Sequence, residues 1–406
     1  MKPSRPCPAC GGTARELLHQ HRFARIDGVS VVDGYAVVAC NDCGMTFADG
    51  VPDQATFDRY YRDASKYTHV RYAGAESPAD AARLRITADV IAKLVPNRSA
   101  QILDVGCATG RLSVELRARG FTSVAGIDPS PAAVDAARRV HGVAAEVGTL
   151  AAASASGHTA ELVILVGVLE HLVDLHTTLD HLRGIVEPGG SVYIEVPDVL
   201  GFADWPNAPF QEFSVEHINY FSAASLARAL AGHGFRLAWH ERTTRQQDAT
   251  TTVATLAALA TRDDAPTAAV TTHHDDGSAM AVRRYIARST RGDVHLRARL
   301  NDIAREHSRV VVWGAGTLTL RMLAAGFFEQ LKIAAFVDSN PRYQGRTVSG
   351  ALIVSPDALP GLGLPVIYSS WGGTSAMSDQ LRNSNSHKVT ALTLFDEQLS
   401  RYLSTN

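Results

Sequence analysis

Four of the five cysteines occur as two close pairs, and their spacing predicts a metal site. Cys7 and Cys10 form one pair, Cys40 and Cys43 the other, and a glycine follows each pair. Glycine suits the tight turn that such a knuckle needs. In a reducing compartment this pattern favours metal ligation over disulfides. Four thiolates fill a tetrahedral coordination sphere, so we expect a structural Zn²⁺ in a zinc ribbon rather than a catalytic ion with an open position.

A second group of residues has the composition of a cofactor loop. Asp104, Gly106 and Gly110 give the spacing D-x-G-x-x-x-G between an apolar run and a helical pattern. Glycines let the backbone approach a ligand that a β-carbon would block. Asp128 ends the next apolar run, twenty-four residues after Asp104, where it is placed to accept hydrogen bonds from two ribose hydroxyls. This pairing alone fits a dinucleotide or S-adenosylmethionine (SAM).

Three details favour SAM over a dinucleotide. An acidic residue opens the turn, the glycine spacing differs from G-x-G-x-x-G, and Glu170-His171-Leu172 follows the fourth apolar run. These features resemble class I SAM-dependent methyltransferases. The resemblance implies a set of cofactor contacts: Asp104, Gly106, Cys107 and Gly110 in the loop, Asp128 at the ribose, and Thr149 and Leu150 at the adenine. The side chain of Cys107 is expected to pack inside the loop, not to act as a nucleophile.

Glu216 and His217 place a carboxylate beside an imidazole, among aromatic residues. Burial and a nearby carboxylate shift an imidazole pKa in opposite directions, and together they leave a useful base at neutral pH. The pair follows the strand expected over residues 191–196, on the ligand side of a parallel sheet. We therefore expect the stretch from Phe202 to Ser222 to form a lid over the methyl donor.

The whole chain resembles the three-domain C-methyltransferases of nucleotide-linked deoxysugars. The resemblance rests on the cysteine pairs, the SAM loop, Glu-His-Ile-Asn-Tyr-Phe-Ser at 216–222 and a final segment with Gly-Ala-Gly at 314–316 and Phe-Val-Asp-Ser-Asn-Pro at 336–341. It implies that His217 removes a proton beside a sugar ketone, with Glu216 as its neighbour and His171 as a polar group of the same site. It also implies that the last domain helps to hold the nucleotide-sugar.

Three positions depart from that family's pattern. Ser214 stands where a tyrosine is usual, Gly314-Ala315-Gly316 replaces Lys-Gly-Asn, and Trp371 is followed by glycine instead of asparagine. These departures affect the substrate more than the fold, so O-methylation of a hydroxyl remains the alternative. The expected substrate contacts are the aromatic rings Tyr67, Tyr72 and Trp371 and the guanidinium of Arg342, since guanidinium suits phosphate.

The elements that must position these groups follow from hydrophobic periodicity. Residues 100–239 alternate apolar strands (101–105, 124–128, 162–166, 191–196) with helical patterns (112–119, 131–140), which predicts a doubly wound parallel sheet with ligands at the strand ends. A strand-turn-helix unit from Arg309 predicts a second, Rossmann-like domain. We expect three domains: 1–75 with the zinc site, 76–260 with the SAM site, and 261–406.

Two local patterns concern the first domain. Asp33-Gly34 between the β-branched runs 29–32 and 35–38 predicts a hairpin. The segment 53–72 is helical in pattern and rich in aromatic residues, which we expect to pack between two domains.

Composition limits the function classes. The 406 residues carry a formal net charge of −2 and are 46% hydrophobic, so the chain lacks the basic excess of duplex-binding proteins. A zinc-ribbon RNA-binding protein, or a scaffold with an inactive SAM fold, remains the alternative from another class. We expect neither a secretory signal nor a membrane span, because the N-terminus has no apolar segment behind its charges and no apolar run reaches about 18 residues. We therefore expect a cytoplasmic enzyme, a monomer or homodimer, with a small-molecule substrate and no nucleic acid.

Overall fold

The computed structural model describes residues 4–63, 76–205, 207–246, 251–263, 273–383, 389–395 and 399. The chain divides into two compact units: unit 1 comprises residues 1–18, 37–202 and 216–282, and unit 2 comprises residues 19–36, 203–215 and 283–406. The division into three domains at residues 75 and 260 stays a prediction. Tyr67 and Tyr72 lie outside the described residues.

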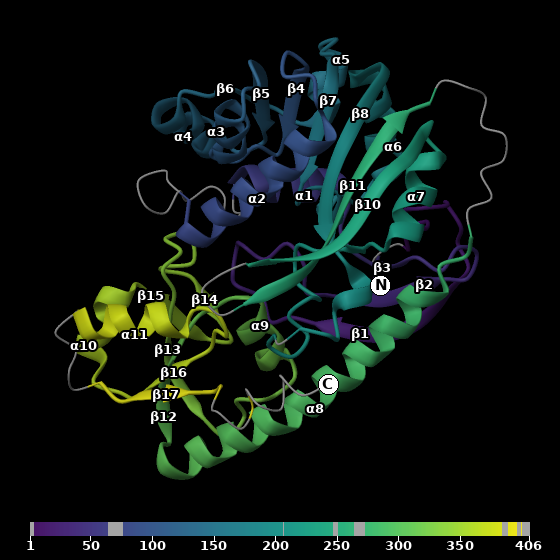
Figure 1. Ribbon diagram of the computed structural model, residues 1–406. Helices are drawn as coiled ribbons and strands as arrows, with labels where there is room; N and C mark the ends of the chain where they lie inside the picture. Colours follow the sequence, from purple (N-terminus) through teal and green to yellow (C-terminus); the bar gives the residue numbers. More distant parts are fainter. Residues whose placement is uncertain are drawn as a thin grey trace. The chain divides into compact units, whose positions relative to one another are not determined.

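Unit 1 is built on a seven-stranded sheet in the order β10-β11-β8-β7-β4-β5-β6 (Figure 1). Five strands are parallel: β4 (Gln101–Val105), β5 (Ser123–Asp128), β6 (Ala144–Val147), β7 (Ala160–Val166) and β8 (Val186–Pro197). The strands β10 (Phe235–Gln246) and β11 (Thr252–Arg262) are antiparallel to their neighbours. The predicted doubly wound sheet is confirmed. Its antiparallel edge was not expected, because the prediction followed the alternation of strands and helices. The strands β10 and β11 are consecutive in sequence and pair without a helical crossover.

Helices cover this sheet. The chain places α2 (Pro78–Leu94), α3 (Arg111–Ala118), α4 (Pro131–His141), α5 (Leu150–Ala155), α6 (Leu175–Ile185) and α7 (Ala223–Ala231) between or after the strands. Both α2 and α4 begin with a serine N-cap followed by proline, Ser77-Pro78 and Ser130-Pro131, and each serine accepts a backbone hydrogen bond. This combination fixes a helix start because it satisfies a free N–H and presets φ.

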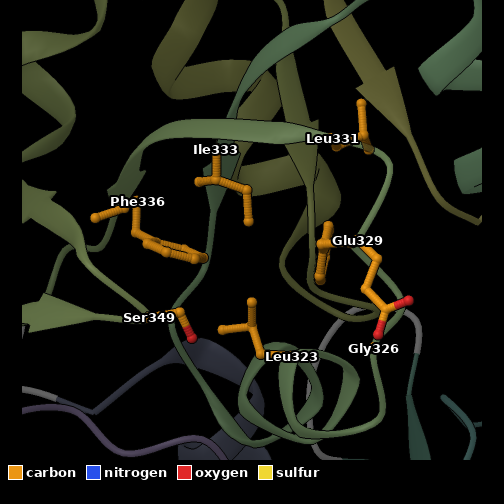
Figure 2. Close-up of a pocket in the computed structure, with 9 residues that line it drawn as sticks. Leu323, Gly326, Glu329, Leu331, Ile333, Phe336 and Ser349 are labelled. Atoms are coloured by element: carbon orange, nitrogen blue, oxygen red, sulfur yellow. The ribbon is translucent and has the colours of Figure 1, made fainter.

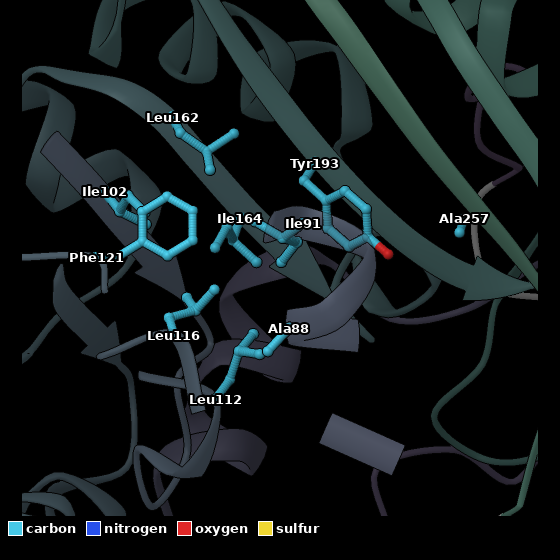
Figure 3. Packing of buried hydrophobic residues seen from close by; sticks show 10 residues of the cluster. All are labelled: Ala88, Ile91, Ile102, Leu112, Leu116, Phe121, Leu162, Ile164, Tyr193 and Ala257. Carbon is cyan, nitrogen blue, oxygen red and sulfur yellow. The ribbon is translucent and has the colours of Figure 1, made fainter. Parts of the chain in front are cut away.

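The core of unit 1 lies between the sheet and two of these helices (Figure 3). Ile91 of α2 and Leu116 of α3 are fully buried and pack with Ile164 of β7 and Tyr193 of β8. Each such aliphatic side chain contributes about 1.5–3 kcal/mol on burial. This packing holds the strand ends, and therefore the loops that follow them, in fixed positions.

A small sheet in the order β1-β2-β3-β9 carries the cysteine segment. Its strands are β1 (Arg15–Arg22), β2 (Gly34–Cys40), β3 (Thr46–Asp49) and β9 (Asn219–Tyr220), and β3 pairs antiparallel with β9. The predicted strand at 29–32 is wrong. Residues 27–29 form a turn, and Ile26 instead bridges to Val348 within unit 2. The helix α1 (Gln54–Asp63) follows β3.

Unit 2 contains a six-stranded sheet in the order β14-β15-β13-β12-β16-β17. The strands β12 (Arg309–Trp313), β13 (Lys332–Val337), β15 (Ala351–Val354), β16 (Val366–Tyr368) and β17 (Ala391–Thr393) are parallel, and β14 (Thr347–Val348) is antiparallel to β15. The helices are α8 (Asp276–Glu306, which begins in unit 1), α9 (Thr317–Ala324), α10 (Leu359–Leu362) and α11 (Thr374–Asn383). The predicted second strand-turn-helix unit is confirmed.

No helix within the described ranges combines the length and the apolar character that a bilayer crossing requires.

Candidate active site

The glycine loop after β4 has the strained backbone that its sequence predicts. Gly106, Ala108 and Gly110 all have positive φ, at 74°, 47° and 83°. A β-carbon on Gly106 would lie 2.9 Å from a methyl group of Val168, and one on Gly110 would lie 3.0 Å from Val143. Glycine is therefore required at both positions, since other L-residues are disfavoured in this region of φ and the space is filled.

Asp128 at the end of β5 closes this loop. Its two carboxylate oxygens accept hydrogen bonds from the backbone N–H of Ala108, at 2.9 Å, and of Ser130, at 2.8 Å. Burial raises the pKa of this carboxyl, although the two N–H groups oppose the shift. A carboxylate oxygen accepts more than one hydrogen bond, so Asp128 retains acceptor capacity for a ribose.

Asp104 is the residue whose environment points to a ligand. Its side chain is 2% exposed, and its Oδ2 atom has no hydrogen-bond partner among the residues that the structure describes. Burial, together with the nearby charge of Asp128, raises the pKa of Asp104 to about 8. A buried oxygen without a donor costs about 1–3 kcal/mol, and the ammonium group of a bound amino acid moiety would remove that cost. The residues present thus fit SAM.

Cys107 faces the protein interior. It packs in a cluster with Val134, Ala137 and Val143, and burial raises the pKa of its thiol. A β-carbon on Gly126 of the adjacent strand would lie 2.6 Å from its sulfur. The predicted packing of the Cys107 side chain is confirmed, and its contact with a cofactor stays a prediction.

The region expected at the adenine lies after β6. Thr149 caps α5 by accepting the N–H of Ala152, and Leu150 is buried. Gly148 donates its N–H to the backbone oxygen of Asp128, and a β-carbon there would meet no described atom within 4 Å. The adenine contacts of Thr149 and Leu150 stay a prediction.

His171 lies in a 3₁₀ turn, η3 (Leu169–His171), that follows β7 beside the glycine loop. This turn and the glycine loop are in contact, because Val168, which directly precedes the turn, lies against Gly106. His171 is 8% exposed, and its Nδ1 atom lies 3.0 Å from the hydroxyl of Tyr61 and 3.1 Å from the backbone oxygen of Glu216. The structure therefore fixes one ring nitrogen of His171.

His217 packs against His171. Their ring centroids are 4.9 Å apart and their planes are 70° apart. One carboxylate oxygen of Glu170 and one ring nitrogen from each histidine all lie within 4.8 Å of one another, so these groups could hold a metal ion. No ion is assigned here. The Nε2 atom of His171 lies 4.0 Å from Glu170 Oε1, so a proton would pass between them only through a bridging water or substrate atom.

Two tyrosines of α1 reach this cluster. Tyr60 donates its hydroxyl hydrogen to Glu216 Oε1 at 2.7 Å, and Tyr61 contacts His171 as above. The side chain of Glu216 thus pairs with a phenol, and a carboxylate oxygen of Glu170 lies 4.0 Å from Nε2 of His171. Sequence reasoning missed Glu170, Tyr60 and Tyr61 as site residues. Their only signal was the Glu170-His171 pair itself and the aromatic density of 53–72.

The lid segment is divided between the units. Residues 203–215 pack in unit 2, where Phe210 donates its N–H to Ser289 at 3.0 Å and Glu212 donates its N–H to the hydroxyl of Tyr285 at 2.8 Å. Glu216 and His217 belong to unit 1. A lid over the donor stays a prediction.

The four paired cysteines converge in unit 1. The sulfur atoms of Cys7 and Cys43 are 3.5 Å apart, and those of Cys10 and Cys40 are 3.6 Å apart. Four sulfurs about 2.3 Å from a tetrahedral Zn²⁺ are separated by about 3.8 Å, so the donor set fits this ion. The two knuckles have matching turns, because the N–H of the glycine after each pair donates to the oxygen of the first cysteine at 2.9 Å.

The residues predicted to bind substrate in unit 2 have separate surroundings. Arg342 is exposed and follows β13. Trp371 follows β16, packs edge-on against Phe395, and has a buried indole N–H without a partner in the described part of the chain. An unpartnered indole N–H can donate to a ligand oxygen.

A hollow of about 280 Å³ in unit 2 involves none of the predicted site residues (Figure 2). Leu323, Ile333 and Phe336 give it an apolar wall, with Ser349 and the carboxylate of Glu329 at its border. This hollow lies beyond the C-terminal end of α9, away from the turn that begins that helix.

Comparison with known proteins agrees with the loop geometry. A family model described as a methyltransferase domain matches residues 79–239. The chain is 28% identical over 191 residues to O-methyltransferase resE of Aspergillus sclerotiorum, which covers 42% of this chain and 69% of that protein. It is 25% identical over 185 residues to C-methyltransferase NovU of Streptomyces niveus. This alignment covers 42% of this chain and 41% of that protein.

Among solved structures, magnesium protoporphyrin IX methyltransferase (ChlM) from Synechocystis PCC 6803 with bound SAH is similar at 15% identity and a TM-score of 0.40. The similarity covers 52% of this chain and 100% of that one. The family match begins in α2, includes the glycine loop, Asp128 and η3, and ends within β10. Residues 79–239 match a methyltransferase domain, and the protein is a SAM-dependent methyltransferase.

Proposed function

We propose that the protein transfers the methyl group of SAM to a carbon atom next to the ketone of a nucleotide-linked sugar, with His217 as the general base. The observation that carries this proposal is the contact between the cofactor loop and the histidine cluster. Gly106 meets Val168, and the turn that follows Val168 carries Glu170 and His171 against His217. A base in that position is close to the loop that would hold the methyl donor.

Bound SAM supplies an activated methyl group on a sulfonium, so the chain's own residues need only orient the acceptor, remove its proton and exclude water. His217 takes the proton from the carbon beside the ketone. Glu170 lies close enough to stabilise the imidazolium that forms, because an adjacent carboxylate favours the charged ring. His171, fixed through Nδ1, presents its other nitrogen to the same cluster.

The hydroxyl of Tyr61 supports carbon rather than oxygen as the methylated atom. The family's usual tyrosine is replaced by Ser214, but two phenols from α1 lie beside Glu216 and His171. A phenol beside a ketone can donate a hydrogen bond to the oxygen that gains charge as the proton leaves. Because Tyr60 donates its one hydroxyl hydrogen to Glu216, we infer that Tyr61 takes this role.

O-methylation of a hydroxyl is the second candidate. Relatives of both kinds match the chain at similar identity. The same base would take a hydroxyl proton, and the oxygen would attack the methyl group. The two reactions differ in the atom that receives the methyl.

The remaining assignments follow the same proposal. Cys7, Cys10, Cys40 and Cys43 hold a structural Zn²⁺. Trp371 and Arg342 of unit 2, with Tyr67 and Tyr72, contact the nucleotide-sugar. The enzyme acts in the cytoplasm as a monomer or homodimer.

The test is a turnover assay with ¹³C-methyl SAM and a nucleoside-diphosphate 4-keto-6-deoxyhexose. Removing a general base costs about 10²–10⁴-fold in rate, so His217→Ala should lose turnover on that scale while it binds SAM normally in calorimetry. His240→Ala is the matched control, since His240 is exposed on β10. Near-normal turnover of His217→Ala would remove this residue as the base.

Deuterium exchange separates carbon from oxygen chemistry. In D₂O with S-adenosylhomocysteine, the wild-type enzyme should introduce deuterium beside the ketone, and His217→Ala should not. The ¹³C shift of the transferred methyl identifies the atom that carries it. A methyl on oxygen, with no exchange beside the ketone, would replace the first proposal by the second.

A further inference from the structure

Arg5 lies two residues before the first cysteine pair and is a buried cation. The reaction proposed above gives it no role. Its side chain is 9% exposed. The guanidinium donates from Nε to Ala48 O at 2.9 Å and stacks over the ring of Phe47, 5.2 Å from its centroid. These two contacts belong to β3 of the small sheet.

The other guanidinium nitrogens of Arg5 reach the two segments that carry the histidines. One donates to Val173 O at 3.1 Å, two residues after His171. The other donates to Ile218 O at 2.8 Å, directly after His217. A single planar group therefore spans both backbone segments.

Asn219 extends this connection into the η3 turn. Its Oδ1 accepts from Arg5 at 2.8 Å, and its Nδ2 donates to the backbone oxygens of Leu169 and Leu172, each at 2.8 Å. Those two oxygens lie on either side of Glu170-His171. The N–H of Ile218 also donates to Glu170 O at 2.8 Å.

The geometry of these contacts is specific to arginine. Four N–H groups of the guanidinium each have an acceptor, and they point in fixed directions because the group is planar. A lysine supplies three donors from one point and cannot span the same acceptors. None of these four hydrogen bonds involves a cysteine sulfur.

We propose that Arg5 is a positioning residue for methyl transfer: acting with Asn219, it holds the turn of His171 and the segment of His217 in register. The segment that precedes the first cysteine pair thereby supports the backbone of both histidine segments. This inference rests on the proposed function, because it assumes that these histidines act on the substrate. A displacement of about 1 Å at a reacting group can cost about 10²-fold in rate.

The test compares Arg5→Lys and Arg5→Ala with Arg98→Lys as the matched control. Arg98 also donates to two backbone oxygens, of Val95 and Ala92, and stacks on Phe121, but it contacts neither histidine segment. For both Arg5 variants we expect kcat to fall about 10–100-fold, with SAM affinity and zinc content within twofold of wild type. Guanidinium ion added to Arg5→Ala should restore part of kcat, and Arg98→Lys should keep kcat.

Asn219→Asp provides a second route to the same answer if the Arg5 variants fold poorly. It keeps an acceptor for Arg5 but loses the amide that donates to Leu169 and Leu172. We expect the same fall in kcat, and the combined Arg5→Lys/Asn219→Asp variant should lose little more than either alone. The side-chain ¹⁵N shifts of His171 and His217 should move in both single variants.

Two results would overturn the inference. One is wild-type kcat in folded Arg5→Lys and Asn219→Asp. The other is a loss of kcat that follows loss of zinc or of folded protein and that guanidinium does not restore. His217→Ala, assayed in parallel, separates the two levels: if it is inactive while the Arg5 variants are normal, only the inference fails, and if it is active, the proposed function fails first.

Discussion

The two strand-turn-helix units of this chain have the same strand order, but they differ in which buried polar groups lack a hydrogen-bond partner among the described residues. In unit 1 the parallel strands follow the order third-second-first-fourth-fifth, and unit 2 repeats that order with β15-β13-β12-β16-β17. In both, an acid at the C-terminal end of the second strand accepts hydrogen bonds from two backbone N–H groups. Ala108 and Ser130 donate to Asp128, and Ala315 and Asn340 donate to Asp338 at 2.8 Å each.

The difference lies at the end of the first strand. Unit 1 has the buried Asp104 with an unpartnered oxygen in the described structure, whereas unit 2 has the fully buried Val312 at the matching position. In unit 2 the hydroxyl of Thr319 lies 2.5 Å from Gly314 O and 2.7 Å from the hydroxyl of Ser369. The second turn thus satisfies its own polar groups. The shared order of strands therefore does not distinguish the two turns; the buried carboxylate of Asp104, with an oxygen that is unpartnered within the described ranges, does.

The largest effect on this comparison is expected from Asp104→Asn. A hydrogen bond to a charged group contributes about 1.5–3 kcal/mol, so SAM affinity should fall about 10–100-fold in calorimetry. The same substitution should stabilise the free protein above pH 7. The pKa of Asp104 is about 8 in the folded protein, well above its value in the unfolded chain. The free energy of unfolding therefore falls as the pH rises from about 4 to 8, and asparagine, which does not titrate, avoids this fall.

SAM binding should depend on pH through the same carboxyl. Below pH 8 Asp104 is mostly protonated in the free protein, and above about pH 8 the α-amino group of the ligand loses its charge. Affinity should therefore be greatest near pH 8 and fall about twentyfold by pH 6. Asp104→Asn should remove the acid limb. An equally steep fall toward pH 6 in that variant would assign the titration to another group.

The cofactor loop and the knuckles could be predicted from sequence because each is a local pattern with one structural solution. Gly106 and Gly110 need positive φ, and the four cysteines at that spacing converge in one cluster. The histidine cluster was only half predictable, because Tyr60, Tyr61 and Glu170 meet His217 through tertiary packing. The failed strand at 29–32 has the same cause: its β-branched residues favour a strand locally, but β2 finds its partner at Arg15–Arg22.

The matched acids offer a smaller, paired effect. Asp128→Asn and Asp338→Asn each remove an acceptor from a backbone N–H, and each should lower the free energy of unfolding by about 1–3 kcal/mol. Only Asp128→Asn should also lower the affinity for SAM, by about tenfold, because Asp128 alone is expected to face the ribose. Chemical denaturation and calorimetry on both variants check this. Weaker SAM binding in Asp338→Asn would link the second turn to the cofactor.

The smallest effect is expected at the glycines before the two helices. Gly316 precedes α9 with φ −83° in the extended region, no described atom lies within 4 Å of its absent β-carbon, and no side chain of the described residues caps the helix. Gly316→Ser should therefore add a cap and stabilise the protein by about 0.5 kcal/mol. Gly110, which precedes α3 at φ 83° with Val143 and Ala137 in contact, should lose at least about 1 kcal/mol as serine. Thermal unfolding measures both. The substrate KM of Gly316→Ser adds the sharper test, because a serine tolerated by the fold but harmful to KM would mean that a ligand approaches the second turn after all.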